Sequence, residues 1–167
     1  MKTLFVVFAA AALLAGCAGP KTVTVDVPFN AEQARAMIKP GKNTITGSGL
    51  VRLQRGGVFT CAGEEVDLIP ATEYAKRRFA ASFGTAGYSP YRTRVKFANT
   101  PSGYSEIRRT ATCDAQGFFK FDKLADGDFF VTTQIVWYSN NTYQGGSMMQ
   151  RVAVAGGEQK DVVLSNR

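Results

Sequence analysis

Residues 127–137 place a set of mostly apolar side chains at every second position, and this alternation limits the chain to few kinds of fold. The set consists of Phe129, Val131, Thr133, Ile135 and Trp137. Because successive side chains of a strand point to opposite faces, a period of two indicates a strand with one buried face. Similar short runs, separated by glycine and asparagine turns, precede and follow this one. The pattern therefore predicts a mainly β protein in which two sheets pack face to face.

Seven strands are predicted in this way. They lie within residues 43–53, 66–69, 106–112, 118–122, 127–137, 148–154 and 161–164. The expected core is Phe119, Phe121, Phe129, Val131, Ile135 and Trp137 together with Ile45, Val51, Val66 and Leu68. By the same alternation, Phe118, Phe130 and Tyr138 should face the other way, exposed or covered by helices.

Two helices interrupt the strand pattern. Asn30 is a good N-cap and Gln33 follows it as in a capping box, so a short helix is expected to start there and end at Pro40-Gly41. Residues 72–83 carry large apolar side chains at near-helical spacing and predict an inserted helix. The glycine- and proline-rich stretch 84–103 is expected to be irregular.

Residues 117–129 read GFFKFDKLADGDF. This segment fits the pattern G-x-F-x-F-x-x-L-x-x-G-x-[YF] and resembles carboxypeptidase regulatory-like domains, which are seven-stranded prealbumin-like (transthyretin-like) β-sandwiches. The resemblance implies an accessory module, over residues 43–167, that does no chemistry itself. Transthyretin-like hydrolases resemble the chain only in architecture, because their activity relies on histidines and this chain has none.

The N-terminus resembles the signal peptide of bacterial lipoproteins. Lys2, an apolar run from Leu4 to Leu14, and the ending Leu14-Ala15-Gly16-Cys17 fit a signal peptide closed by a lipobox. The alternative is a transmembrane anchor, but the apolar run is shorter than the ~20 residues that such an anchor needs. The resemblance implies cleavage after residue 16 and acylation of Cys17 with a diacylglyceryl group and palmitate.

Four segments follow from these patterns: a signal peptide over 1–16, a lipidated tether over 17–29, a short helix and turn over 30–42, and the sandwich over 43–167. Ala18 stands where, by resemblance to enteric lipoproteins, an aspartate would favour retention in the inner membrane. We therefore expect a lipid anchor in the outer membrane with the domain facing the periplasm, rather than the inner membrane or the cell surface.

Cys61 and Cys113 remain as an even pair once Cys17 is lipidated. In an oxidising periplasm such a pair predicts a disulfide, and two separate buried thiols are the alternative. Closing so long a loop would stabilise the fold by ~4 kcal/mol in the chain-entropy model. No metal site or other cofactor is expected, because two cysteines without histidine do not complete a zinc shell.

A catalytic role is not expected. Without histidine, acid–base chemistry would depend on carboxylates such as Glu64, Glu65 and Asp67, or Asp126 and Asp128. A glycosidase with paired carboxylates is the enzymatic alternative, but the pair Asp126 and Asp128 is also typical of a turn. The chain has no G-x-S-x-G motif and no phosphate-binding loop.

The net charge is +7, and basic residues concentrate in the middle of the chain. Arg77, Arg78, Arg92, Arg94 and Lys96 are candidates for contact with an anionic surface, such as lipid head groups, lipopolysaccharide or peptidoglycan. Dispersed, solvated charge is the alternative. Nucleic acid is not an expected partner, because an envelope lipoprotein rarely meets it.

Two functions remain open at this point. The first is a non-catalytic structural or protein-binding module of the cell envelope. The second is a module that binds carbohydrate, either peptidoglycan or another glycan, in which Tyr138 and Tyr143 with Asn140 and Asn141 present a sugar-binding loop. A plain hairpin loop, in which the asparagines supply turn geometry, is the structural alternative for those four residues.

Overall fold

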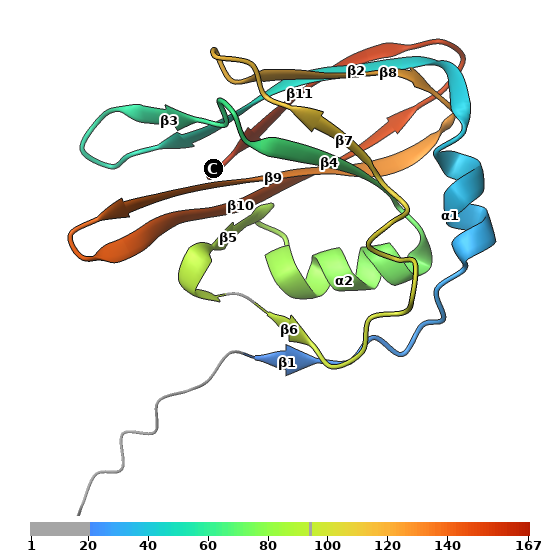
Figure 1. Cartoon of the computed structure of the whole chain (residues 1–167), viewed down its shortest axis with the longest axis horizontal. Coiled ribbons are helices and arrows are strands. Elements are labelled where there is room, and N and C mark those ends of the chain that lie inside the picture. The colour runs from blue at the N-terminus through green and yellow to red at the C-terminus, as the bar shows by residue number, and fades with distance from the viewer. Residues whose placement is uncertain (1–20, 94) are drawn as a thin grey trace, which may run out of the picture.

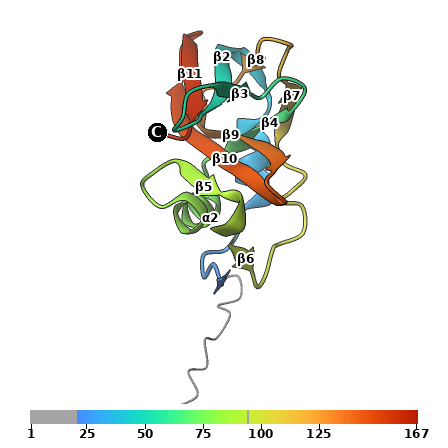
Figure 2. The same ribbon diagram turned by 90° about the vertical axis from the view of Figure 1, so that its left-hand side faces the viewer.

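The computed structural model describes residues 21–93 and 95–167, and it shows two large β-sheets and a helix in three layers, beside a third sheet of two short strands (Figures 1 and 2). The helices are α1 (Ala31–Met37) and α2 (Glu73–Phe83), and a 3₁₀ turn, η1, spans Tyr91–Thr93. The strands are β1 (Thr22–Val23), β2 (Pro40–Arg52), β3 (Val58–Thr60), β4 (Glu65–Pro70), β5 (Tyr88–Pro90), β6 (Lys96–Phe97), β7 (Arg109–Thr112), β8 (Phe118–Leu124), β9 (Gly127–Ser139), β10 (Thr142–Val154) and β11 (Gln159–Ser165).

The sandwich consists of a five-stranded and a four-stranded sheet. The five-stranded sheet is antiparallel, with the order β5-β10-β9-β4-β7. In the four-stranded sheet, the long β2 pairs with β11 in parallel on one side, and with both β3 and β8 in antiparallel on the other. The predicted β-sandwich is therefore confirmed.

All seven predicted strands are present, as β2, β4 and β7 to β11. The structure adds four short ones, β1, β3, β5 and β6, of two or three residues each. Such pieces are too short to show a period in sequence, so the stretch 84–103, expected to be irregular, in fact contains β5, η1 and β6.

The core between the two sheets matches the predicted alternation. Phe119 and Phe121 are 5% and 2% exposed, whereas Phe118, which points to the opposite face of the strand from Phe119, is 57% exposed. All ten predicted core residues belong to or pack against this core, with Trp137 half-buried at its edge. Glycine in β2 makes room for the aromatic side chains: a Cβ at Gly47 would lie 2.6 Å from Cζ of Phe119.

The helix α2 forms the third layer. It lies on the face of the five-stranded sheet that points away from the four-stranded sheet (Figure 1). There Phe130 of β9 is 5% exposed and stacks on Phe79 of α2, with ring centroids 4.2 Å apart. This explains why Phe130 is buried although it points away from the core, and it shows that α2, not both helices, covers it.

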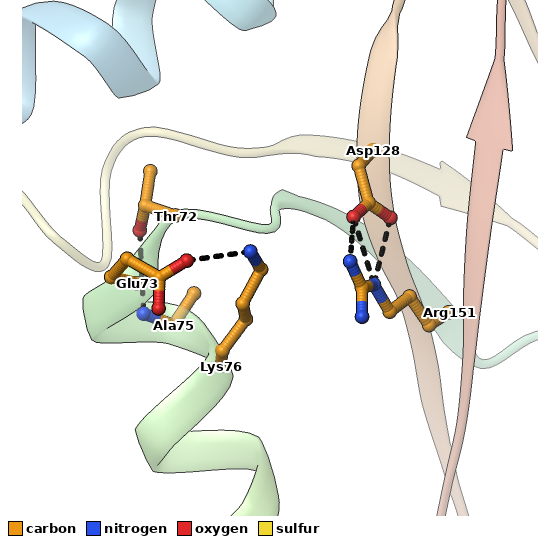
Figure 3. Close-up of polar contacts among 6 residues, drawn as sticks. All are labelled: Thr72, Glu73, Ala75, Lys76, Asp128 and Arg151. Carbon is orange, nitrogen blue, oxygen red and sulfur yellow. Dashed lines mark hydrogen bonds and ion pairs between the residues drawn. The ribbon is translucent and has the colours of Figure 1, made fainter.

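The first turn of α2 is fixed by capping and by charge (Figure 3). The hydroxyl of Thr72 accepts a hydrogen bond from the backbone N–H of Ala75, as expected of an N-cap. Lys76 donates to Glu73 at 2.6 Å, and its ammonium holds the pKa of that carboxyl below its usual value. These contacts stabilise the first turn of α2, and the stacking of Phe79 on Phe130 holds the helix against β9.

The shorter helix α1 begins as predicted, because the Asn30 side chain accepts from the backbone N–H of Gln33. It is only seven residues long and ends at Met37, and β2 already starts at Pro40. Pro40-Gly41 therefore opens the strand instead of forming a separate turn. Met37 packs against the core from this end of the sandwich.

A disulfide joins Cys61 to Cys113, with Cα atoms 5.7 Å apart and a sequence separation of 52. The predicted bridge is confirmed. Both sulfur-bearing residues are buried in the core, and the disulfide ties the segment before β4 to the segment after β7. Cys17 lies outside the described residues.

Candidate functional site

The hairpin between β9 and β10 ends in exposed tyrosines. Asn140 and Asn141 form its two-residue turn with φ values of 52° and 58°, a left-handed geometry that asparagine tolerates well. Tyr138 and Tyr143 are directly opposite each other on the two strands, with ring centroids 5.2 Å apart. Their exposed fractions are 62% and 54%. The asparagines thus supply the turn, and the tyrosines supply the accessible surface.

Tyr91 of η1 extends this group, because its ring lies 5.4 Å from that of Tyr143. Arg92 donates to the hydroxyl of Thr142 and so fastens η1 to the hairpin. We call Tyr91, Tyr138 and Tyr143 the tyrosine cluster. A shallow pocket of about 310 Å³ lies between η1 and β10 beside the cluster.

A polar strip continues from the tyrosine cluster along the outer face of the five-stranded sheet. On β9, Thr132 and Gln134 share the face of Tyr138 by strand alternation. Gln134 donates to the hydroxyl of Ser147 on β10 at 3.1 Å. These three side chains, Thr132, Gln134 and Ser147, are the polar strip.

The polar strip borders an open pocket of about 440 Å³ at the start of β4. The carboxyl groups of Glu65 and Asp67 line it, together with Glu64 and Gly63. Arg108 Nε lies 3.0 Å from Asp67 Oδ1, and the Thr110 hydroxyl donates to the same oxygen. The predicted acidic group of Glu64, Glu65 and Asp67 therefore lies at a polar pocket. Within it, the Asp67 carboxylate is already bound by Arg108 and Thr110.

The second acidic group has structural roles. Asp128 forms an ion pair with Arg151 across β9 and β10 (Figure 3), which raises the pKa of the guanidinium. Asp126 accepts hydrogen bonds from the Asn43 side chain and the Gly156 backbone N–H, which lower the pKa of its carboxyl. The two carboxyl groups thus hold separate parts of the fold.

A second pocket, of about 300 Å³, lies between α2 and the outer face of the same sheet. Its walls are largely apolar and come from α2, β4 and the segment after η1: Ile69, Phe79, Phe83, Val95, Phe97 and Tyr104. Polar groups enter it from several sides: Arg78, Ser82, Ser89, Thr132 and Ser147. We call it the helix pocket. It shares Thr132 and Ser147 with the pocket at the start of β4, so the two adjoin along the polar strip.

Arg78 is the only charged residue that lines the helix pocket among the described residues. Its guanidinium carbon lies 3.7 Å from the ring centroid of Phe97 and 4.8 Å from that of Tyr104. Nη1 donates to the Tyr74 hydroxyl at 3.2 Å and to the Thr100 hydroxyl at 3.1 Å. Burial raises the pKa of Tyr104 to about 12, so this phenol stays neutral beside the cation at physiological pH.

The structure separates the five basic residues predicted as one anionic-surface contact. Arg77 is exposed on α2 and lines a shallow pocket with residues 23–27, and Lys96 is paired in register with Thr22 of β1. Arg78 faces the helix pocket, and Arg92 is bound to the β9–β10 hairpin. Arg94 lies outside the described residues. Arg77 and Lys96 therefore lie beside the first described segment of the chain, which belongs to the predicted tether.

Sequence reasoning found the tyrosine pair of the hairpin but not the helix pocket. The rings around Arg78 come from residues 74, 97 and 104, which three separate segments bring together. The available signal in the sequence was a basic helix followed by an irregular stretch rich in aromatic residues. This signal indicated only a surface with both basic and aromatic side chains. Among the described residues, no helix is long and apolar enough to cross a membrane.

The chain was compared with protein families, curated proteins and solved structures. No protein-family model matches the chain, and no curated protein matches it in sequence. Among solved structures, the fold is similar to that of a Pseudomonas aeruginosa protein described as a "putative carbohydrate binding protein". The TM-score is 0.68 and the sequence identity 25%, and the match covers 84% of this chain and 99% of the other. The likeness to carboxypeptidase regulatory-like domains stays a prediction from residues 117–129.

Proposed function

We propose that the protein is a non-catalytic glycan-binding module of the cell envelope, held at the periplasmic face of the outer membrane by a lipid on Cys17. The observation that carries the glycan proposal is the tyrosine cluster next to the polar strip on one open sheet face. The structural similarity to a protein described as carbohydrate-binding supports it.

The chemistry of this face suits a sugar chain. Tyrosine rings offer flat apolar surfaces with a polar tip, and the faces of sugar rings are rows of C–H groups that pack against such surfaces. Tyr138 and Tyr143 are exposed enough to do so. Hydroxyl and amide groups of Thr132, Gln134 and Ser147 can exchange hydrogen bonds with sugar hydroxyls. At about 3.4 Å per residue, β10 separates Ser147 from Tyr143 by about 14 Å, which gives an extended rather than a point-like surface.

The predicted lipoprotein signal supplies the location, and peptidoglycan is the abundant glycan within reach of a periplasmic domain. Arg77 and Lys96, beside the start of the described chain, are placed to face the anionic surface to which the tether leads. This arrangement would leave the β9–β10 hairpin free to contact glycan.

A protein-binding role is the second candidate, and a different surface favours it. On the outer face of the four-stranded sheet, Phe118 and Val163 are both opposite Ser48 of β2, and they are 57% and 51% exposed. The two side chains thus flank β2 on one exposed sheet face, and apolar side chains gathered on one exposed face are a feature of protein-binding surfaces. This surface lies on the other side of the sandwich from the tyrosine cluster (Figure 1).

One experiment separates the two candidates. The soluble domain from residue 21, and its variants Tyr143→Ala and Phe118→Ala, would be incubated with insoluble peptidoglycan and with a glycan array. A glycan-binding module predicts retention that Tyr143→Ala reduces about tenfold and Phe118→Ala leaves unchanged. Absence of binding to every glycan, with a protein partner recovered from crosslinked envelopes and lost in Phe118→Ala, would replace the proposal with the protein-binding role.

A further inference from the structure

We propose that the helix pocket binds the carboxylate of an acidic sugar, with Arg78 as the anion-recognising group. This inference rests on the proposed glycan-binding function and specifies its ligand class. The two proposals have separate residues, Arg78 for the acid and the tyrosine cluster for the sugar chain.

The state of Arg78 is the first observation. Its guanidinium is half-buried among aromatic rings, and no carboxylate of the described residues lies within ion-pair distance of it. By contrast, Arg108, Arg109 and Arg151 each have an aspartate partner. A cation that is partly removed from water and lacks a counter-charge favours an anionic ligand.

The geometry of Arg78 is the second observation. The ring of Phe97 stacks against the guanidinium, and Nη1 is held by the hydroxyls of Tyr74 and Thr100. The Phe97 ring and these two hydroxyls therefore fix the plane of the guanidinium. A guanidinium held in this way presents two parallel N–H groups, which match the two oxygens of a carboxylate.

The composition of the pocket points to a sugar acid rather than to a fatty acid or an inorganic anion. Aromatic and aliphatic walls from Phe79, Phe83 and Ile69 suit the apolar face of a ring. Hydroxyls of Ser82, Ser89, Thr132 and Ser147 line the same volume of about 300 Å³ and suit the edge of a polyhydroxylated ring. A single cation matches the single charge of a carboxylate better than the double charge of a phosphate monoester.

The helix pocket also adjoins the proposed glycan surface. Ser147 and Thr132 belong both to its lining and to the polar strip, and Ser89 pairs with Ser147 at the edge strand β5. The strand β5 ends at Pro90 and η1 begins at Tyr91, and both residues line the pocket beside the tyrosine cluster. A glycan whose acidic unit enters the helix pocket could therefore continue along β10 toward Tyr143.

The test measures monosaccharide binding by calorimetry with the soluble domain. Glucuronic acid and N-acetylmuramic acid are the acidic probes, and glucose and N-acetylglucosamine are the neutral ones. We expect at least one acidic probe to bind roughly tenfold or more tightly than its neutral counterpart, since hydrogen bonds to charged groups are the stronger ones. Glucose 6-phosphate distinguishes the anion, and tighter binding of the phosphate than of either carboxylate would overturn the assignment.

Three variants locate the site. Arg78→Gln removes the charge and should abolish the preference for the acid, whereas Arg77→Gln, on the next residue of the same helix, should keep it. Ser82→Leu fills the pocket from α2 without changing a contact of Arg78, and it should weaken both acidic and neutral probes. Because Arg78→Gln could loosen α2, the Ser82→Leu variant keeps the test decisive if the first variant is unfolded.

The outcomes for the two proposals are distinct. Equal affinity for acidic and neutral sugars, with no effect of Arg78→Gln or Ser82→Leu, overturns the acidic-sugar inference even if glycan polymers still bind. A preference for the acid that Tyr143→Ala leaves intact supports the helix pocket as a separate subsite. Failure of all sugars and polymers to bind rejects the proposed function and this inference together.

Discussion

The interior of the sandwich and the outer face of its five-stranded sheet are two sides of the same strands, yet they differ in almost every property. On β9, Phe129 and Val131 point inward and are fully buried, while Thr132 and Tyr138 point outward. The inward side is apolar and closed by a disulfide. The outward side mixes rings, hydroxyls, an amide and a guanidinium around two pockets. One side is shaped by packing, and the other is available for a ligand.

Polar groups show the same contrast. Within the described residues, every buried side-chain nitrogen or oxygen has a hydrogen-bond partner, as in the Thr133 hydroxyl that donates to the Glu65 carbonyl oxygen at 2.7 Å. On the outer face, Arg78 lacks an acidic partner and its hydrogen bonds go only to hydroxyls. The polar groups of the interior thus bond to the protein itself, whereas a guanidinium with no carboxylate beside it can still gain a charge-assisted hydrogen bond from an anionic ligand.

The largest expected effect is at the centre of the interior. Phe121 is 2% exposed and lies among the core side chains of both sheets. Phe121→Ala should lower the free energy of unfolding by about 3–5 kcal/mol, from lost burial and the cavity left behind. Phe118→Ala, on the same strand but facing solvent, should cost less than about 1 kcal/mol. Urea unfolding of both variants measures the difference, and equal costs would break the contrast between the two faces.

The disulfide should have the next largest effect. Replacing Cys61 and Cys113 by alanine should lower the free energy of unfolding by about 2–5 kcal/mol, because the bridge restricts the unfolded chain over a long loop. Adding reductant should lower the stability of the wild type by the same amount, and it should leave the stability of the double variant unchanged. Unchanged thermal unfolding with and without reductant would show that packing alone holds this part of the interior.

A smaller effect is expected at the end of the sandwich, where buried Asn43 joins three segments. Its Nδ2 donates to the Leu124 carbonyl oxygen and to Asp126, and its Oδ1 accepts from the backbone N–H groups of Gly157 and Glu158 at 2.7 and 2.9 Å. Asn43→Ala should cost about 1–3 kcal/mol, since these groups lose their partners.

Asn166 offers a matched control for Asn43. Its side chain makes two hydrogen bonds, both to the backbone of Arg52 and in a more exposed place, where Asn43 makes four. Asn166→Ala should therefore cost under about 1 kcal/mol in the same unfolding experiment. Similar costs for the two variants would mean that burial does not decide the worth of such bonds here.

The contrast also explains how much could be predicted from sequence. Inward positions obey a period of two over whole strands, so the sandwich and the burial of Phe119 and Phe121 were predictable. The pair Cys61 and Cys113 was predictable from its even number and expected compartment. The helix pocket was not, because Arg78, Phe97 and Tyr104 meet only through the path of the chain after α2. Pairings such as β1 with β6 join pieces of two residues that carry no periodic signal.

A further effect, smaller again, concerns pH. Hydrogen bonds from Asn43 and Gly156 hold the pKa of Asp126 below its usual value, so the unfolded chain takes up this proton first as the pH falls. The contribution is complete above the unfolded pKa of about 3.9 and is lost as the pH falls through the lower folded pKa. The stability difference between wild type and Asp126→Asn should therefore shrink from pH 5 to pH 2. A difference that grows toward low pH would reverse the sign.

The smallest effect on folding is expected where the effect on binding should be greatest. Tyr138 and Tyr143 contact each other, and Tyr143 also contacts Tyr91, but neither belongs to the core. Tyr143→Ala should change the free energy of unfolding by no more than about 0.5 kcal/mol, as is usual for exposed positions. The turn is kept by Asn140 and Asn141, whose geometry does not depend on the rings. A loss of stability comparable to that of Asn43→Ala would make the tyrosine cluster a structural element of the hairpin. If stability is unchanged while glycan retention falls, the outer face carries residues that serve binding and not folding.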